Sequence, residues 1–129
     1  MTRHAFADLH VPGEPLVLFN IWDAGSAVAV AKAGAKAIAT GSASLAGAQG
    51  FADGEAIPLE ALLATTRQIH AAIQVPLTVD FESGFSEDVE TLSANARALA
   101  QAGAVGCNLE DQMIGTGGLR EADEQAARI

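Results

Sequence analysis

Acidic side chains follow two apolar segments of the chain, at the point where each segment ends. Asp80 and Glu82 are separated by one residue, and Glu110 follows the next apolar segment. Two carboxylates about 5 Å apart repel by roughly 3 kcal/mol at an effective dielectric of about 20, so such a group needs a cation, a shared proton or wide separation in water. Oxygen ligands without a nearby histidine or thiolate favour Mg²⁺, with Mn²⁺ possible. The spacing therefore predicts a Mg²⁺ site on Asp80, Glu82 and Glu110, unless these are ordinary capping and solvent-facing acids.

Residues 41–54 (GSASLAGAQGFADG) form a stretch of small residues between an expected strand and an expected helix. In such a loop backbone N–H groups can approach an anion, and the hydroxyls of Ser42 and Ser44 add donors. Asp53, near the far end, is placed to reach over the site. The alternative is an ordinary flexible connection with no role in binding.

The elements that must position these residues alternate along the chain. Apolar segments predict strands, and stretches with helical spacing and capping residues predict helices. The expected strands are residues 17–22, 37–40, 77–82 and 104–110, and the expected helices are residues 24–32, 58–73, 87–102 (with Ser86 as N-cap) and 119–129. Strands that are apolar on both faces and alternate with helices predict a parallel sheet covered by helices. Because side chains alternate along a strand, Asp80 and Glu82 would share one face of this sheet.

Two architectures fit four β-α units in a single domain of residues 1–129. A doubly wound sheet would be complete with four or five strands, whereas a TIM (β/α)₈ barrel would be half built. No GxGxxG or GxxxxGK[ST] motif follows any expected strand, which weakens the nucleotide-binding form of the doubly wound sheet. In either fold, ligands bind at the carboxyl ends of the strands. The polar residues expected there are Asn20, Asp23, Gly41, Ser42, Asp80, Glu82, Asn108, Glu110 and Asp111.

The composition narrows the class of protein. Seven Lys and Arg against sixteen Asp and Glu give a formal net charge of −9, so we expect neither a nucleic-acid nor a membrane partner. The single cysteine, Cys107, excludes an intrachain disulfide, and the chain shows no apolar run typical of a membrane span or signal peptide. These features predict a cytoplasmic protein. Cys107 is expected in the core, facing the helices, while Trp22 fits either the core or a pocket wall.

Five segments occur in a fixed order: residues 20–27 (NIWDAGSA), 40–46 (TGSASLA), 50–55 (GFADGE), 79–85 (VDFESGF) and 106–112 (GCNLEDQ). Together they resemble the isocitrate lyase/phosphoenolpyruvate mutase superfamily, in particular its carboxyphosphonoenolpyruvate phosphonomutase-like members. The resemblance implies the amino-terminal half of a TIM (β/α)₈ barrel, with only the first four β/α units in this chain. It also implies a homo-oligomeric enzyme that binds Mg²⁺ and a small 2-oxo acid or phosphonate. Such enzymes make or break a C–C or P–C bond next to the enolate carbon.

The resemblance, carried over position by position, implies roles for the candidate residues. By this resemblance, Asp80 matches the family residue that binds the metal directly. Glu82 and Glu110 match family residues that hold metal-bound waters. Asp53 matches the acid of a mobile gating loop, and with Glu110 it is expected to be catalytic. The substrate-binding residues implied by the resemblance are Trp22, Gly41, Ser42, Ala43 and Asp80.

The sequence also departs from the family pattern. The lyases of the family carry a Lys-Lys/Arg-Cys-Gly-His segment shortly after Glu-Asp-Gln, whereas residues 113–120 (MIGTGGLR) contain neither cysteine nor histidine. We therefore expect a mutase, hydrolase or decarboxylase rather than an isocitrate lyase. Many members have Asp-x-Asp where this chain has Asp80-Phe-Glu82. A full barrel needs about 250 residues. We therefore expect that the chain is a truncated product of such a barrel, or that two copies pair to close the sheet. The alternative function is a catalytically inactive half barrel that serves as a folding or assembly unit.

Overall fold

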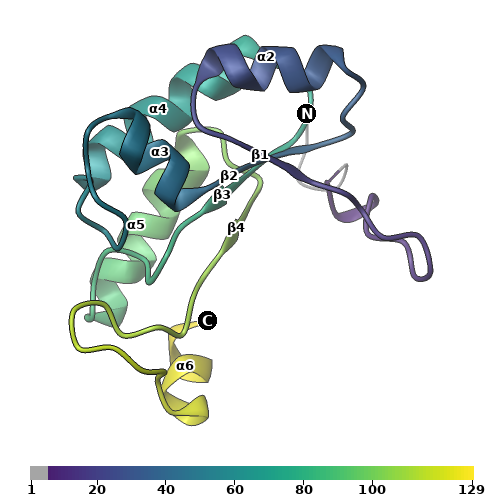
Figure 1. Cartoon of the computed structure of the whole chain (residues 1–129). Helices are drawn as coiled ribbons and strands as arrows, with labels where there is room; N and C mark the ends of the chain where they lie inside the picture. Colours follow the sequence, from purple (N-terminus) through teal and green to yellow (C-terminus); the bar gives the residue numbers. More distant parts are fainter. Residues whose placement is uncertain (1–5) are drawn as a thin grey trace.

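Four short parallel strands form one sheet in the order β1-β2-β3-β4 (Figure 1). The structure is a computed structural model and describes residues 6–129. The strands are β1 (Phe19–Ile21), β2 (Ile38–Thr40), β3 (Leu77–Asp80) and β4 (Gly106–Asn108). Each strand is hydrogen-bonded to the next along the chain, so β1 and β4 are the edges of the sheet.

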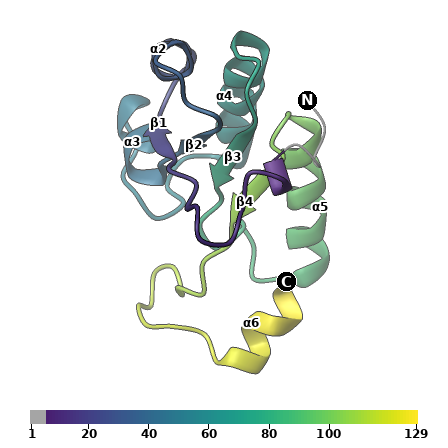
Figure 2. The same ribbon diagram turned by 90° about the vertical axis from the view of Figure 1, so that its right-hand side faces the viewer.

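Helices cover one face of this sheet. The main helices of the structure are α2 (Ala24–Lys32), α3 (Ser42–Ala48), α4 (Leu59–Ala72), α5 (Val89–Gln101) and α6 (Ala122–Arg128). Figures 1 and 2 show α2, α4 and α5 on the same side of the strands, with α6 beyond the carboxyl end of β4. The core lies between them, and it includes Ile21, Ile38, Leu77 and Val79 from the strands and Leu62, Leu63, Ile69, Leu92 and Leu99 from the helices.

The strand order bears on the choice between the two expected architectures. A doubly wound sheet reverses its strand order and carries helices on both faces, whereas consecutive units of a barrel keep sequential order with helices outside. The observed order is sequential and parallel throughout. The predicted parallel sheet covered by helices is therefore confirmed, and its order favours barrel units; the half barrel itself stays a prediction.

Local chemistry explains where the helices begin and end. At the start of α2, the Asp23 carboxylate accepts a hydrogen bond from the backbone N–H of Ser26 at 2.7 Å, and the Ser26 hydroxyl accepts one from the N–H of Asp23. This reciprocal pair satisfies two N–H groups that the first turn of a helix leaves unpaired. Gly34, just after α2, has φ +101°, a conformation that glycine adopts without steric cost.

Several predicted boundaries were wrong. Residues 42–48 form α3 instead of a loop, because serine and alanine at its start and centre permit a helix that the sequence pattern alone does not mark. Asp88, and not Ser86, caps α5, since its carboxylate accepts a hydrogen bond from the N–H of Thr91 at 2.8 Å. The last helix begins after Glu121 because Leu119 pairs with Gln112 in an isolated β-bridge. The strands are also shorter than expected.

The expectation that Cys107 lies in the core was wrong. Its side chain faces the helices as predicted, but β4 is an edge strand and the residue is exposed. Cys107 lines a hollow with Leu92 and Ser93 of α5 and Arg128 of α6. Across residues 6–129, the structure has no helix with the length and apolar character needed to cross a membrane.

Candidate active site at the carboxyl edge of the sheet

The loops that follow β2, β3 and β4 meet at the carboxyl edge of the sheet. The backbone N–H of Ser42, at the start of α3, donates a hydrogen bond to Oδ2 of Asp80 at 3.1 Å. The backbone N–H of Glu110 donates one to the carbonyl oxygen of Glu82 at 2.7 Å. The structure therefore brings the predicted substrate-binding segment and the chain segments of all three predicted metal ligands to one place.

Asp80 is the last residue of β3 and is half-buried. Its backbone N–H donates to the hydroxyl of Thr40, a buried residue of β2, at 3.0 Å. Its carboxylate accepts the Ser42 N–H described above and a long, weak hydrogen bond of 3.4 Å from the N–H of Glu82. These contacts hold Asp80 at the carboxyl end of β3, between β2 and the loop after β3.

Glu82 is a buried acid, with 5% of its surface exposed. Its Oε2 accepts a hydrogen bond from the backbone N–H of Glu55 at 2.8 Å. Burial is the largest cause that raises the pKa of the Glu82 carboxyl to about 7, because desolvation disfavours the charged form. Nearby negative charges raise this pKa as well, those of Asp53, Glu55 and Asp80.

The pKa of Glu110 is also raised by its surroundings. Burial is the first cause that raises the pKa of the Glu110 carboxyl, and Asp80 and Asp53 contribute next. Asp53 itself lies exposed in a turn of the loop between α3 and α4. Its negative charge contributes to the raised pKa of both Glu82 and Glu110. That Asp53 reaches over the site stays a prediction.

All three predicted metal ligands are carboxylates, the donor group that Mg²⁺ prefers. Within residues 6–129, no three His, Cys, Asp or Glu side chains are close enough to coordinate one ion together, and no Lys, Arg or His in that range forms an ion pair with Asp80, Glu82 or Glu110. Mg²⁺ commonly keeps several waters and binds one or two carboxylates directly. A group of neighbouring acids without a basic partner, one of them buried, has the donor chemistry for such an ion.

The residues predicted to hold a substrate carboxylate begin α3. A side chain at position 41 would crowd two neighbouring side chains, because an added Cβ would lie 2.9 Å from the Ser44 Oγ and 3.2 Å from the Asn20 Nδ2. Ser42 is half-buried, and Ala43 is exposed. This close packing fixes the first turn of α3 against the end of β1.

Trp22 follows β1 directly and is 42% exposed, so the core alternative for this residue was wrong. Its backbone N–H donates to the hydroxyl of Ser26 at 3.2 Å, which ties the residue to the start of α2. The remaining interpretation, a pocket wall, stays a prediction.

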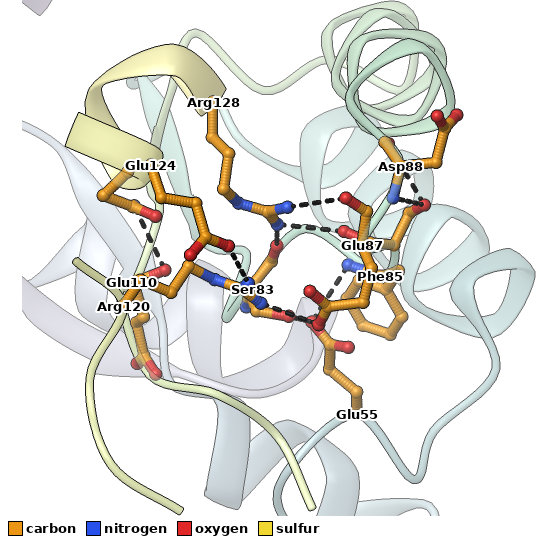
Figure 3. A network of polar contacts seen from close by, with 11 residues as sticks. Glu55, Ser83, Phe85, Glu87, Asp88, Glu110, Arg120, Glu124 and Arg128 are labelled. Carbon is orange, nitrogen blue, oxygen red and sulfur yellow. Dashed lines mark hydrogen bonds and ion pairs between the residues drawn. The ribbon is translucent and has the colours of Figure 1, made fainter. Parts of the chain in front are cut away.

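The sequence pattern did not indicate a role for one residue at this edge. Glu55 links the loop before α4 to the loop after β3, because its Oε1 accepts hydrogen bonds from Ser83 and Phe85 (Figure 3). An acid two positions after Asp53 is visible in the sequence, but its contact lies 28 residues away and depends on a turn with positive φ.

Two buried arginines fasten α6 to the loop after β3. The guanidinium of Arg128 donates to three backbone carbonyl oxygens of that loop, and Arg120 pairs with Glu87 and Glu124 (Figure 3). The segment between β4 and α6 folds back on itself, with the N–H of Met113 donating to the carbonyl of Gly118 at 3.0 Å. In the sequence, this turn directly follows the Glu-Asp-Gln segment of residues 110–112.

Comparisons with known proteins agree with this fold. The family model described as Phosphoenolpyruvate phosphomutase matches residues 6–129. An uncharacterized protein of Mycobacterium tuberculosis (strain ATCC 25618 / H37Rv) is 36% identical over 107 residues, which are 83% of this chain and 40% of that protein. The 2-methylisocitrate lyase of Escherichia coli (strain K12) is 29% identical over 116 residues, 81% of this chain and 39% of that enzyme.

Solved structures extend the comparison. A proposed phosphonomutase from Burkholderia cenocepacia J2315 is 50% identical, with a TM-score of 0.95 over 98% of this chain and 52% of that chain. A phosphonopyruvate hydrolase, solved in complex with oxalate and Mg²⁺, is 19% identical and shares the fold, with a TM-score of 0.91 over 99% of this chain and 46% of that chain. The chain thus spans 40% or less of the curated relatives described above. It belongs to the phosphoenolpyruvate phosphomutase family, within the isocitrate lyase/phosphoenolpyruvate mutase superfamily.

Proposed function

We propose that this chain carries the Mg²⁺-binding half of an active site for a small 2-oxo acid, in an enzyme that makes or breaks a C–C or P–C bond next to the enolate carbon. The observation that carries the proposal is the meeting of Ser42, Asp80 and the loop of Glu82 and Glu110 at one edge of the sheet. Residues 1–129 would be one domain, corresponding to four units of a (β/α)₈ barrel.

The metal would be held by the three acids. Asp80, half-buried and fixed by Thr40, is the direct ligand, and Glu82 and Glu110 accept hydrogen bonds from waters on the ion. Bound Mg²⁺, or Mn²⁺ in its place, would offset the negative charge that develops on the enolate oxygen. The glutamate at position 82 keeps the charge and acceptor oxygens of the family's aspartate.

The substrate would lie beside the metal. The segment of Gly41, Ser42 and Ala43 orients its carboxylate through backbone and hydroxyl groups, and Trp22 forms a wall next to this segment. Ser42 supports this role, because its N–H already points to a carboxylate oxygen, that of Asp80. Asp53, on the exposed turn between α3 and α4, would close over the bound acid and exclude water, and Glu110 would act with it in catalysis.

The reaction class follows from the segment after β4. Residues 113–120 contain no cysteine or histidine, so they offer no side chain that could replace the acid–base groups of the isocitrate lyase segment. We propose a mutase, hydrolase or decarboxylase reaction instead. The complex of the phosphonopyruvate hydrolase with oxalate and Mg²⁺ supports the ligand class, since oxalate mimics an enolate of pyruvate.

A second candidate is a catalytically inactive assembly unit. Val17 and Phe19, at the β1 edge, are 64% and 56% exposed, and uncovered apolar edges favour association. We propose that the chain forms a homo-oligomer through such edges, in the cytoplasm, where a single exposed cysteine remains reduced.

A turnover assay tests the proposal. The chain is incubated with Mg²⁺ and either oxaloacetate or phosphonopyruvate, and products are followed by ¹H and ³¹P NMR. Turnover that falls by about 10²-fold or more in Asp80→Asn supports the enzyme, with Asp111→Asn, an exposed acid on the same edge, as control. Binding of Mg²⁺ and oxalate without turnover would favour the inactive unit, and neither binding nor turnover would refute the proposed site.

A further inference from the structure

The side chain of Glu55 joins two loops that are distant in the sequence. All the hydrogen bonds that its carboxylate accepts within residues 6–129 end on Oε1: the N–H of Ser83 at 2.9 Å, the hydroxyl of Ser83 at 2.8 Å and the N–H of Phe85 at 2.9 Å. Figure 3 shows Glu55 reaching toward Ser83 and Phe85. The loop before α4 is thereby fastened to the loop after β3, the loop that carries Glu82.

The backbone of Glu55 contacts Glu82 directly. Its N–H donates to Oε2 of the Glu82 carboxylate at 2.8 Å. One residue therefore holds Glu82 in two ways: its N–H fixes the carboxylate, and its side chain fixes Ser83, the next residue along the chain. Because Glu82 is buried, water does not compete with either contact.

The backbone conformation here would not persist without such contacts. In the part of the chain that the structure describes, three residues other than glycine have positive φ, and all three belong to this cluster: Glu55 at 59°, Glu82 at 48° and Phe85 at 60°. Left-handed backbone is unfavourable for residues with a Cβ and is kept only where the surroundings enforce it. The hydrogen bonds of Glu55 are the contacts that link all three residues.

A carboxylate at this position carries an electrostatic cost. Glu55 adds a negative charge that raises the pKa of both Glu82 and Glu110. A carboxylate is nevertheless a better acceptor than an amide for several N–H and O–H groups on one oxygen. A cation bound between the acids would offset the added repulsion, so the tether and a metal site support each other.

We propose that Glu55 is a positioning residue that orients the Glu82 carboxylate toward the metal-bound waters, acting through Ser83, Phe85 and its own N–H. The inference rests on the proposed function, because it assigns a role to Glu55 within that metal site. Glu55 does not touch the metal or the substrate in this account. Its side chain acts through geometry, and its charge is secondary.

Three variants separate geometry from charge. Glu55→Gln keeps an oxygen where Oε1 lies and removes the charge; Glu55→Asp keeps the charge but is one methylene too short to hold Ser83 and Phe85 in place. Glu55→Ala removes both. Glu90→Ala, an exposed residue of α5, is the control for the loss of one negative charge elsewhere.

Two measurements on the full chain are compared: amide hydrogen exchange of Ser83 and Phe85 without metal, and the affinity for Mg²⁺ alone by titration calorimetry. We expect exchange about fivefold faster or more in Glu55→Ala and Glu55→Asp, and Mg²⁺ binding about tenfold weaker or more. Glu90→Ala should remain near the unmodified chain in both. Glu55→Gln, whose amide oxygen is a weaker acceptor, should stay closer to the unmodified chain than Glu55→Asp does. If Glu55→Ala does not fold, the contrast between Glu55→Asp and Glu55→Gln decides.

The outcomes are distinguishable. An unmodified chain that binds Mg²⁺, together with Glu55→Ala or Glu55→Asp variants that bind it equally well, overturns the role of Glu55 alone. A Glu55→Gln variant that loses binding while Glu55→Asp keeps it shows a role in charge and also overturns the proposal. An unmodified chain that does not bind Mg²⁺ overturns the proposed function and this role with it.

Discussion

The backbone N–H of Ser42 points at Oδ2 of Asp80, 3.1 Å away, across the carboxyl ends of β2 and β3. The residue proposed to orient a substrate carboxylate is thus a direct neighbour of the residue proposed to bind the metal. A small 2-oxo acid has its carboxylate and its 2-oxo group on adjacent carbons. A ligand of that size can therefore contact the start of α3 and an ion at Asp80 together.

Replacing Gly41 by alanine tests the substrate side of the site. The new Cβ would lie 2.9 Å from the Ser44 Oγ and 3.2 Å from the Asn20 Nδ2, so these side chains must move and the start of α3 becomes more crowded. We expect the affinity for oxalate in the presence of Mg²⁺ to fall about tenfold, a loss of roughly 1.4 kcal/mol, while Mg²⁺ binding alone is unchanged. Titration calorimetry measures both.

Gly47→Ala is the matched control for this variant. Gly47 also lies in α3, but no atom is within 4 Å of its added Cβ. Its oxalate affinity should equal that of the unmodified chain. If Gly41→Ala binds oxalate as well as Gly47→Ala does, the start of α3 has no part in binding the carboxylate.

The pKa of Glu82 predicts a pH dependence of stability. Burial raises this pKa to about 7 from 4.5, so the folded chain binds the proton more tightly than the unfolded chain. The contribution of Glu82 to the free energy of unfolding is then fully present below about pH 4.5 and is lost as the pH rises through 7. Glu110, whose pKa is also raised, adds a change in the same direction.

Urea unfolding without metal, between pH 5 and 8, measures this effect. Glu82→Gln cannot titrate at this position, so the difference between the unmodified chain and the variant isolates Glu82 from other groups. We expect the unmodified chain to lose stability relative to the variant as the pH rises. If the difference in the free energy of unfolding between the two chains does not change with pH, the carboxyl of Glu82 does not have a raised pKa in the folded chain.

Arg128 is expected to matter for stability. Its guanidinium donates to the carbonyl oxygens of Ser83 at 2.7 Å, Ser86 at 2.9 Å and Glu87 at 3.1 Å, and the residue is buried. Arg128→Ala leaves buried acceptors without partners, so the free energy of unfolding should fall by about 2 kcal/mol. Urea unfolding tests this, and Arg97→Ala, at an exposed position of α5, should change it by less than about 0.5 kcal/mol. Equal effects of the two variants would show that the contacts of Arg128 do not hold α6 in place.

The exposed edges of the sheet predict association. Size-exclusion chromatography with light scattering should give a mass above the 13.1 kDa of one chain. Replacing Phe19, 56% exposed on β1, by lysine should shift the population toward the monomer, since charged side chains on an edge strand oppose pairing. A stable monomer of the unmodified chain would contradict this prediction.

The order of strands and helices could be predicted because capping residues and glycines separate each apolar segment from the next. Asp23 and Gly34, for example, mark both ends of α2 in the sequence as they do in the structure. Residues 42–48 could not be recognised as a helix, because glycine, alanine and serine carry no amphipathic pattern. The first residue of this helix donates its backbone N–H to Asp80 of β3, a contact that the sequence pattern does not reveal.

The acids of the site could be predicted for a similar reason. Asp80, Glu82 and Glu110 interrupt apolar segments, and a parallel sheet brings the ends of neighbouring strands together. Glu55 could not be found in this way, since its contacts depend on three residues with positive φ in two loops. Cys107 was placed on the correct face but not in the correct environment, because sequence periodicity does not tell how much of an edge strand is covered.

Thermal unfolding with Mg²⁺ and oxalate tests the central claim that the acids at the sheet edge form a divalent-ion site for a 2-oxo acid. A ligand that binds only the folded chain raises its stability by about 2.7 kcal/mol at a hundredfold excess over Kd. We predict that millimolar Mg²⁺ raises the melting temperature, that oxalate raises it further only when Mg²⁺ is present, and that Asp80→Asn abolishes both shifts. An unchanged melting temperature of the unmodified chain with both ligands at millimolar concentration would contradict the account.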